Sequence, residues 1–471
     1  MPVNVLESIS WNEAVMMLII FFCTVMPIFH MLNAFPIIRK RKMYKAQSAT
    51  VQRKISVIIP CYNEALAVKS TIGGLNKVNY DHVEYIFIND GSTDDTMESL
   101  SRYLKLKVTN RKGQNQLAYQ SIRNVYQSTL YQSIFVIDKM NGGKADALNA
   151  GCDFADGEII VTLDADSILS EDALSIINTA FSDQNVIAAG GMVHTLQGNQ
   201  YNSRTVSFNN RFIVRFQIVE YLKSFYVYKA SLARLNALAI ISGAFGAFNR
   251  RILLQLGGYS KTIGEDIDIT MKFQQYRYKH PQCKIVLVPN AICYTEVPEN
   301  WDDLFKQRVR WQKAFLDCIV KYFPFLMKTL FTRSLSFFFI VDGLLVGTLA
   351  SIFTIINLIF SPYFRDPWTS IRLVELYVVC SLMLNFFYTY VALFISHRFK
   401  FKVRNREKYI MLLTVFLDLC FYRFITVLFL IYGSFAYFFN SKDWNKVQRT
   451  GKYYLKKDGS DAVLKKEASV S

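Results

Sequence analysis

Ile55-Ser-Val-Ile-Ile-Pro60 is a short, continuous apolar run, and the polar residues Tyr62, Asn63 and Glu64 stand just after it. Its length and its β-branched residues are typical of a buried strand, and an amphipathic stretch over 64–75 follows it. The same alternation continues, with strands predicted over 83–88, 134–137 and 158–163. Helices are predicted from the N-cap signal Ser92-Thr-Asp-Asp95 to about Tyr103, over 144–154 and over 170–181, the last capped by Ser170. Continuous apolar strands that alternate with helices indicate a parallel sheet buried on both faces.

An apolar run near the start of the chain covers residues 14–38 and contains no Asp, Glu, Lys or Arg. This run is long enough for a helix that crosses a bilayer. Its leading flank is acidic, whereas Arg39-Lys-Arg-Lys42 follows it, and basic flanks stay in the cytosol. We therefore expect residues 1–13 to be extracytoplasmic, 14–38 to be a transmembrane helix and 39–298 to form a cytosolic domain.

Apolar segments return in the last third of the chain. Residues 334–364 and 373–396 are predicted transmembrane helices, and the connector after the second is strongly basic and therefore internal. The stretch before them, 299–331, mixes apolar and basic residues at helical spacing, which is typical of amphipathic helices at a membrane surface.

The last apolar segment, 409–440, leaves two topologies open because Asp418 and Arg423 interrupt it. A single crossing would put the basic tail, 441–471, outside the cell, against the charge rule. A re-entrant hairpin bent near the two charged residues would keep that tail in the cytosol. We favour the hairpin and keep the transmembrane helix as the alternative.

The composition excludes several classes of protein. With 52% hydrophobic residues the chain is not disordered, and with eight scattered Cys in 471 residues it is no disulfide scaffold. None of the Cys forms a CxxC pair, so the pattern favours reduced thiols over a zinc site. The net charge of +17 comes from basic residues that flank apolar segments and form no aromatic-studded patch, so we expect no nucleic-acid partner.

Acidic residues stand at the ends of predicted strands. Asn89-Asp90-Gly-Ser92 follows the strand over 83–88, and Asp164-Ala-Asp166 follows the strand over 158–163, while Gly264-Glu265-Asp266 precedes a later helix. Two carboxylates one residue apart at a strand end lie on one side, where they can hold Mg²⁺ or Mn²⁺ on a diphosphate. Each cluster alone could be a turn or a helix cap. Together with Tyr62-Asn-Glu64 they indicate one phosphate-binding edge of the sheet.

From about residue 55 to residue 322 the chain resembles the membrane-embedded, processive glycosyltransferases of family 2, the group of cellulose, hyaluronan, chitin-type and poly-N-acetylglucosamine synthases. The resemblance rests on Val57-Ile-Ile-Pro-Cys-Tyr-Asn-Glu64, Asn89-Asp-Gly-Ser92, Gly143-Lys-Ala-Asp-Ala-Leu-Asn149, Asp164-Ala-Asp166, Ser242-Gly-Ala-Phe-Gly-Ala-Phe-Asn-Arg250, Gly264-Glu-Asp266 and Gln307-Arg-Val-Arg-Trp311. It implies an α/β GT-A fold, with a Rossmann-like parallel sheet in the cytosolic domain, plus α-helical transmembrane segments.

The resemblance also implies a role for each motif residue. The UDP part of a UDP-sugar donor would be bound by Tyr62, Glu64, Asp90, Lys144 and Asp164, and its diphosphate by Gln307, Arg308 and Arg310. The metal, Mg²⁺ or Mn²⁺, would be held by Asp166 with Asp164. Asp266 would be the catalytic general base for inverting transfer, Glu265 would help to place it, and Trp311 would stack on the acceptor sugar.

The motif details favour UDP-N-acetylglucosamine as the donor and a β-linked, extruded polysaccharide of the biofilm type as the product. Gln312-Lys-Ala-Phe315, however, departs from the small, glycine-rich continuation of the poly-N-acetylglucosamine enzymes, which leaves another UDP-sugar, as in hyaluronan or glucan synthases, as an alternative. A second alternative is non-processive transfer of one sugar to a lipid or glycolipid, and a third is a channel with a non-catalytic domain. The implied location is the plasma membrane, and the implied partners are the growing glycan, membrane lipids and either a small membrane subunit or further copies of the chain.

Overall fold

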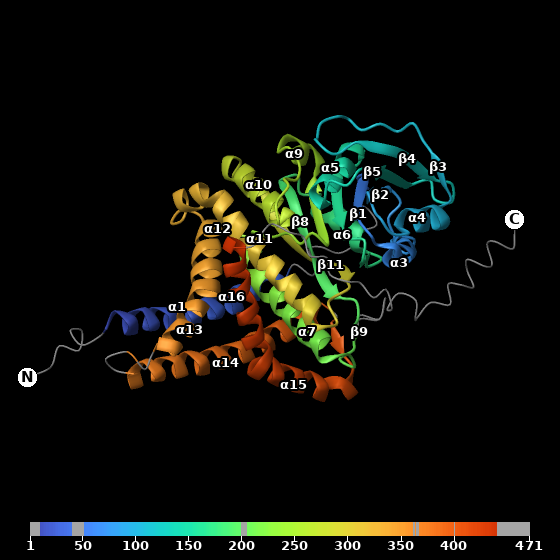
Figure 1. The fold of residues 1–471 in the computed structure, drawn as a ribbon. Coiled ribbons are helices and arrows are strands. Elements are labelled where there is room, and N and C mark those ends of the chain that lie inside the picture. Colours follow the sequence, from blue (N-terminus) through green and yellow to red (C-terminus); the bar gives the residue numbers. More distant parts are fainter. Residues whose placement is uncertain are drawn as a thin grey trace, which may run out of the picture.

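The computed structural model describes residues 10–39, 51–198, 205–360, 363, 367–399 and 401–439. Residues 1–9 of the expected extracytoplasmic N-terminus, most of the basic flank after 14–38 and the expected cytosolic tail lie outside these residues. In Figure 1 an α/β part stands at one end of the molecule and long apolar helices at the other. The amphipathic helix α11 (Trp301–Lys328) runs between the two parts.

The α/β part is built on a ten-stranded sheet in the order β3-β4-β5-β2-β1-β6-β10-β8-β11-β7. Its strands are β1 (Ile55–Cys61), β2 (Val83–Asp90), β3 (Leu106–Val108), β4 (Ile122–Ser128), β5 (Ile134–Lys139), β6 (Ile159–Leu163), β7 (Ser167–Leu169), β8 (Val186–Thr195), β10 (Phe245–Asn249) and β11 (Lys284–Thr295). A separate parallel pair joins β9 (Thr205–Val206) to β12 (Lys402–Val403).

The predicted parallel core is present. Strand β1 pairs in parallel with β2 and with β6, and β2 pairs in parallel with β5. The sheet is nevertheless mixed, because β10 lies antiparallel between β6 and β8, and β4 lies antiparallel to β5. The sequence predicted neither antiparallel strand. Strand β10 pairs with segments far from it in the chain, and β4, although it is close to β5, was not predicted as a strand.

Both faces of the sheet are covered, which explains why its central strands are apolar without interruption. Successive side chains of a strand point to opposite faces, so Val57 and Ile59 belong to one buried core and Ile58 to the other. The first core packs under α3 (Ala65–Leu75), α4 (Thr96–Leu104) and α6 (Ala173–Ala180), and the second under α5 (Lys144–Phe154), α9 (Arg250–Gln255) and α10 (Glu265–Lys279).

The starts of the expected helices agree with the sequence in two cases and differ in one. Helix α5 covers the predicted residues, and α4 begins at Thr96, directly after the predicted cap signal, with Asp95 at the N-cap position. The predicted cap of α6 was wrong, because the residue at the N-cap position is Asp172 and not Ser170. The Ser170 hydroxyl instead donates to the Asp172 carboxylate over 3.0 Å.

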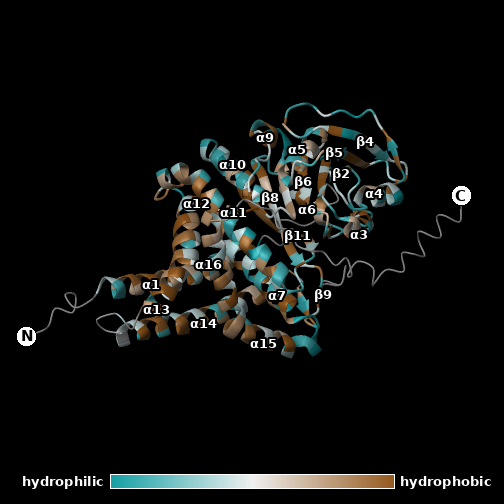
Figure 2. Ribbon diagram, viewed as in Figure 1, coloured by the Kyte–Doolittle hydropathy of each residue, from teal (hydrophilic) through white to brown (hydrophobic). Residues whose placement is uncertain are grey.

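Among the described residues, four helical stretches are long and apolar enough to cross a membrane: Trp11–Arg39, Ser334–Phe360, Trp368–Arg398 and Asn405–Phe439. They overlap the four apolar segments singled out in the sequence, and Figure 2 shows their hydrophobic residues along these helices. Their elements are α1 (Trp11–Ala34), α12 (Ser334–Phe337), η3 (Phe338–Leu349), α13 (Ala350–Phe360), α14 (Pro367–Arg398), η5 (Asn405–Glu407), α15 (Lys408–Leu417), η6 (Asp418–Tyr422) and α16 (Arg423–Phe439). Which of them cross the bilayer, and in which direction, stays a prediction.

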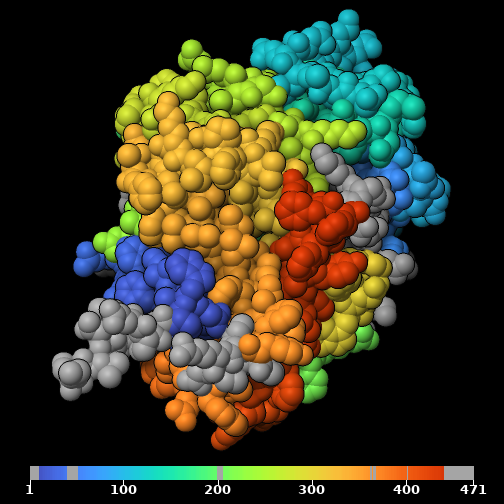
Figure 3. All heavy atoms as spheres, turned by 60° about the vertical axis from the view of Figure 1, so that its left-hand side comes forward, coloured from blue at the N-terminus to red at the C-terminus, as the bar shows by residue number. Residues whose placement is uncertain are grey.

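The last apolar segment changes direction where its two charged residues stand. The chain leaves α15, passes through the π-helical segment η6 at Asp418 and enters α16 at Arg423, and the two helices point in different directions in Figure 1. Helix α16 packs along α11, where Gly433 lies against Gln312. Figure 3 shows α16 (red) at the surface beside α11 (yellow) and the α12–α13 stretch (orange). A re-entrant hairpin and a single crossing both remain open.

The remaining helices, α7 (Phe212–Lys223), the π-helical η2 (Ser224–Tyr228) and α8 (Lys229–Arg234), form one continuous stretch. This stretch packs against β8 and against α1 and α14, so it joins the sheet to the apolar helices.

Candidate active site

A cavity of about 320 Å³ lies between the sheet, the start of α10 and one face of α11. Seven of the residues singled out in the sequence line it: Lys144, Asp164, Glu265, Asp266, Gln307, Arg310 and Trp311. The remaining five, Tyr62, Glu64, Asp90, Asp166 and Arg308, do not line it. These seven residues come from α5, the end of β6, α10 and α11, so the fold brings together groups up to about a third of the chain apart.

Lys144 lies at the centre of the charged wall. It is the first residue of α5, and Gly143 before it has a φ of +90°, a conformation that side chains disfavour. The Lys144 Nζ lies 2.7 Å from Asp164 Oδ1 and 3.0 Å from Glu265 Oε1. Burial alone would lower the pKa of Lys144, but the two carboxylates outweigh burial and raise it, so the ammonium stays charged.

Asp266 is the carboxylate that can act as a base. It stands in the first turn of α10, where the backbone N–H groups and the helix dipole favour negative charge. Its Oδ2 accepts a hydrogen bond from the Gly243 N–H over 3.4 Å. Burial, followed by the charge of Glu265, raises the pKa of Asp266 above its ordinary value. A carboxylate with a raised pKa is a better acceptor for a hydroxyl proton near neutral pH.

The two acids of the Asp164-Ala-Asp166 motif have different surroundings. Asp164 follows β6 and faces the cavity, while Asp166 is buried and its Oδ1 accepts from Ser167 Oγ (3.1 Å) and Thr295 Oγ1 (3.2 Å). Within the described ranges no three His, Cys, Asp or Glu side chains cluster closely enough to hold a metal by themselves. Two carboxylates with a hydroxyl beside them still fit Mg²⁺ or Mn²⁺, because these ions take oxygen ligands and share them with substrate phosphates.

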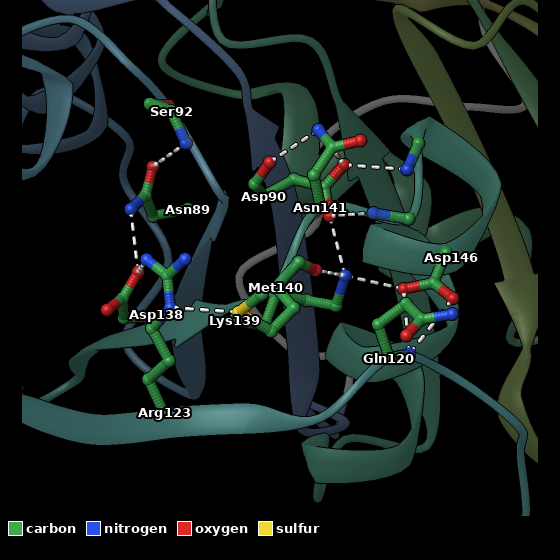
Figure 4. Close-up of polar contacts among 12 residues, drawn as sticks. Asn89, Asp90, Ser92, Gln120, Arg123, Asp138, Lys139, Met140, Asn141 and Asp146 are labelled. Carbon is green, nitrogen blue, oxygen red and sulfur yellow. Dashed lines mark hydrogen bonds and ion pairs between the residues drawn. The ribbon is translucent and has the colours of Figure 1, made fainter.

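Asp90 holds the loop that carries Lys144 (Figure 4). Its Oδ1 lies 2.6 Å from the buried Lys139 Nζ, and its Oδ2 accepts from the Gly143 N–H over 2.8 Å. Asn141 Nδ2 also donates to the Asp90 carbonyl over 2.7 Å. In this structure Asp90 therefore fixes the start of α5, and its predicted contact with the nucleotide stays a prediction.

Tyr62 and Glu64 stand at the same edge of the sheet as Asp90. They follow β1, whose last residue, Cys61, pairs with Asn89 on β2. The Tyr62 side chain is exposed, and the Glu64 N–H donates to Thr96 Oγ1 over 2.7 Å. Their predicted roles in binding the nucleotide are compatible with this edge and remain untested.

Helix α11 presents Gln307, Arg310 and Trp311 to the cavity, because residues three and four apart share a helix face. Arg308 points elsewhere. Its guanidinium lies 2.6 Å from Glu220 Oε2 and 2.5 Å from Gln307 Oε1, with the Trp311 ring centre 4.2 Å away. In this structure Arg308 therefore contacts Glu220, Gln307 and Trp311. The contact of Arg308 with a diphosphate stays a prediction.

A second, basic cavity of about 350 Å³ adjoins the first and shares Lys144, Glu265 and Arg310 with it. It is also lined by Lys261, Lys306 and Lys313 and by the backbone of Gly142 and Gly143 at the start of α5. Lysines together with a helix N-terminus suit an anion such as a diphosphate.

A third cavity, of about 430 Å³, lies among the apolar helices and shares Glu220 and Ser224 with the first. Its walls hold two close polar pairs, His30 Nε2 to Asp342 Oδ2 at 3.1 Å and Lys223 Nζ to Asp418 Oδ2 at 2.7 Å. The π-helical segments η2, η3 and η6 all contribute residues to it.

Comparison with known proteins decides the family. Residues 56–257 match the model of glycosyl transferase family 2, and residues 159–439, more than half of the chain, match that of glycosyl transferase family group 2. The chain belongs to this glycosyltransferase family. Its predicted fold class, a GT-A α/β domain with apolar helices of transmembrane length, agrees with the match and with the mixed sheet.

Named relatives of this glycosyltransferase include poly-beta-1,6-N-acetyl-D-glucosamine synthases. The chain is 28% identical over 288 residues to that synthase of Staphylococcus epidermidis, a match that covers 61% of this chain and 60% of the relative. It is 29% identical over 276 residues to the synthase of Staphylococcus aureus (strain COL), covering 58% of each. The matches thus span about three fifths of these relatives. A mannosyltransferase from Pyrobaculum calidifontis, solved with GDP-Man and Mn²⁺, superposes with a TM-score of 0.49 over 80% of this chain and 97% of its own, at 17% identity.

Glu220 and Lys229 line the first cavity of this glycosyltransferase from the α7–α8 stretch and were not predicted, because no motif marks them. The available signal was the presence of charged residues in a stretch rich in apolar ones, where buried charges need a partner or a polar cavity.

Proposed function

We propose that this protein is a membrane-embedded, inverting, processive glycosyltransferase that polymerises a UDP-activated sugar and extrudes the product. The best candidate donor is UDP-N-acetylglucosamine, joined in β-linkage, because the named relatives are poly-N-acetylglucosamine synthases. The observation that carries the proposal is the single cavity in which the base Asp266, the Lys144–Asp164 pair and Trp311 meet.

In the proposed reaction the acceptor sugar stacks on Trp311 and points a hydroxyl at Asp266. Asp266 takes the hydroxyl proton while the acceptor oxygen attacks the anomeric carbon of the donor. The bond from that carbon to the diphosphate breaks, its electron pair goes to the phosphate oxygen, and UDP leaves. Attack from the side opposite the leaving group inverts the anomeric configuration.

The donor diphosphate is proposed to lie where the first and second cavities meet. Arg310 lines both of them and offers a planar donor set that matches phosphate oxygens. Lys261 and Lys313 supply further positive charge to the same place. Mg²⁺ or Mn²⁺, held by Asp164 and Asp166, would offset the charge that develops on the diphosphate.

Extrusion of the product is proposed through the third cavity. This cavity joins the acceptor side of the first one at Glu220 and Ser224 and lies between helices of transmembrane length. Its polar walls suit hydroxyl-rich sugars, which need hydrogen-bond partners in place of water. This arrangement requires a multi-pass location in the plasma membrane, with the catalytic domain in the cytosol and the glycan leaving on the far side.

The test is an assay of purified, membrane-reconstituted protein with a panel of UDP-sugars and with Mg²⁺ or Mn²⁺. UDP release and product size are read together. UDP-N-acetylglucosamine is expected to give UDP release with a ladder of long products. A single added sugar would instead establish non-processive transfer, preference for another UDP-sugar would overturn the donor assignment, and no UDP release with any donor would overturn the enzyme.

A further inference from the structure

Lys229 places a second ammonium group in the cavity of Asp266. It begins α8, directly after the π-helical segment η2, and lines the cavity together with Asp266. Its Nζ lies 4.2 Å from the centre of the Phe225 ring, which lines the same cavity. This contact with the face of an aromatic ring holds the ammonium in place without neutralising it.

The two lysines of the cavity differ in what surrounds their charge. Lys144 lies between two carboxylates, Asp164 at 2.7 Å and Glu265 at 3.0 Å, so its charge is largely compensated. In the part of the chain that the structure describes, no carboxylate lies within ion-pair distance of Lys229. Lys229 therefore supplies a second positive charge that acts on Asp266, beside that of Lys144.

The charged groups around Asp266 show why the charge of Lys229 matters for the pKa of Asp266. The titratable groups that act on it or feel its charge are Glu265 on its own helix, Lys144 on α5, Lys229 on α8, Tyr259 before α10 and Cys318 on α11. Burial and Glu265 raise the pKa of Asp266, while the two lysines lower it. Burial in turn lowers the pKa of Lys229 to about 8, against the opposing pull of Asp266.

We propose that Lys229 is a positioning residue of the sugar transfer, whose ammonium keeps the Asp266 carboxylate charged inside the buried cavity. The inference rests on the proposed function, in which Asp266 is the base that accepts the hydroxyl proton. Lys144 is shared by Asp164 and Glu265, so without Lys229 the buried Asp266 next to Glu265 would bind a proton more readily and be a poorer base. In the proposed reaction Lys229 does not touch the reacting atoms. It acts through Asp266.

The test compares pH profiles of kcat/KM for membrane-reconstituted wild type, Lys229→Met and Lys229→Arg, with UDP-N-acetylglucosamine as the donor. Activity on the acid side requires a deprotonated Asp266, so removal of a neighbouring positive charge moves the acid limb to higher pH. We expect a shift of about one pH unit for Lys229→Met and a return toward the wild-type midpoint for Lys229→Arg. Lys272→Met is the matched control, because Lys272 is a half-buried lysine on α10 outside the cavity. Its midpoint is expected to stay at the wild-type value.

Binding of UDP by each variant, measured by calorimetry, shows that it is folded, and Lys229→Gln replaces Lys229→Met if the latter does not bind. An unchanged acid limb in the neutral variant overturns the proposal. An equal shift in Lys229→Met and Lys229→Arg also overturns it, because shape and not charge would then matter. Failure of the proposed function gives a different result, since Asp266→Asn would then keep its activity.

Discussion

The first and third cavities both bury charged side chains, but they balance the charges differently. Around Asp266 the carboxylates crowd at the start of α10 and next to β6, and one ammonium, that of Lys144, serves two of them. Among the apolar helices, Asp342 and Asp418 each have one close partner, His30 and Lys223. The first arrangement makes the protonation of Asp266 depend on its charged neighbours, which suits proton transfer, and the second pairs its buried polar groups, which suits a stable wall.

This comparison predicts that charge changes in the first cavity alter the reaction and that charge changes in the third alter stability. The largest expected effect is that of Asp266→Asn. The amide keeps the shape of the side chain but cannot accept the hydroxyl proton, so turnover is expected to fall by about 1,000-fold or more. UDP binding is expected to stay near the wild-type value. UDP release measured at saturating donor checks this, and a variant that keeps its activity would remove Asp266 as the base.

Lys223→Met tests the third cavity. It leaves Asp418 buried without its partner at 2.7 Å, and breaking a buried pair in this way costs about 3 kcal/mol or more. Thermal unfolding in detergent is expected to show a clear drop in Tm, while the double variant Lys223→Met with Asp418→Asn regains part of the loss. Additive losses in the double variant would mean that the two charges do not interact, and the contrast between the cavities would fail.

Asp166→Ala separates the metal from the rest of the nucleotide site. We expect UDP affinity measured with Mg²⁺ or Mn²⁺ to fall about tenfold or more, while affinity without metal changes little. Calorimetric titrations with and without metal make the comparison. Asp172→Ala, which changes a nearby acid at the start of α6, is the control and is expected to leave both affinities unchanged. Equal affinities for Asp166→Ala and wild type under both conditions would take Asp166 out of the metal site.

Trp311→Ala is expected to have the smallest effect on chemistry and a visible effect on product size. Loss of the ring removes one stacking surface for the acceptor sugar, worth about 1 kcal/mol, or about fivefold in acceptor affinity. Hydrolysis of the donor should continue while the glycan products become shorter. Gel analysis of product length checks this, and an unchanged length distribution would argue against a stacking role.

Local sequence patterns predicted those helices and strand ends that depend on residues close together in the chain. The helix over 144–154 and the strand ends at Asp90 and Asp164 follow from short apolar runs, turn residues and their order along the chain. The antiparallel insertion of β10 between β6 and β8 does not, because only long-range pairing decides which strand fills that place. The same holds for Lys139, which pairs with Asp90 from 49 positions away in the sequence.

The candidate site was predictable to a similar degree. The motifs identified seven residues that the fold does bring to one cavity, including Asp266 and Trp311. The helical period of α11 could also have separated Arg308 from Arg310, because residues two apart lie about 160° apart around a helix. The charges of Glu220 and Lys229 could have been noticed in the sequence, but their approach to α10 and α11 depends on how the α7–α8 stretch packs against the sheet.

The π-helical segments η2, η3 and η6 make the shape of the third cavity sensitive to the deletion of single residues. Each of them fits more residues into its turns than an α-helix does and bends or displaces the helix that contains it. Removing a single residue from one of these segments would allow ordinary α-helical spacing to return, straighten the helix and rotate every side chain beyond that point. Along these stretches, length therefore matters more than residue identity, and a one-residue deletion is expected to be more damaging than many substitutions.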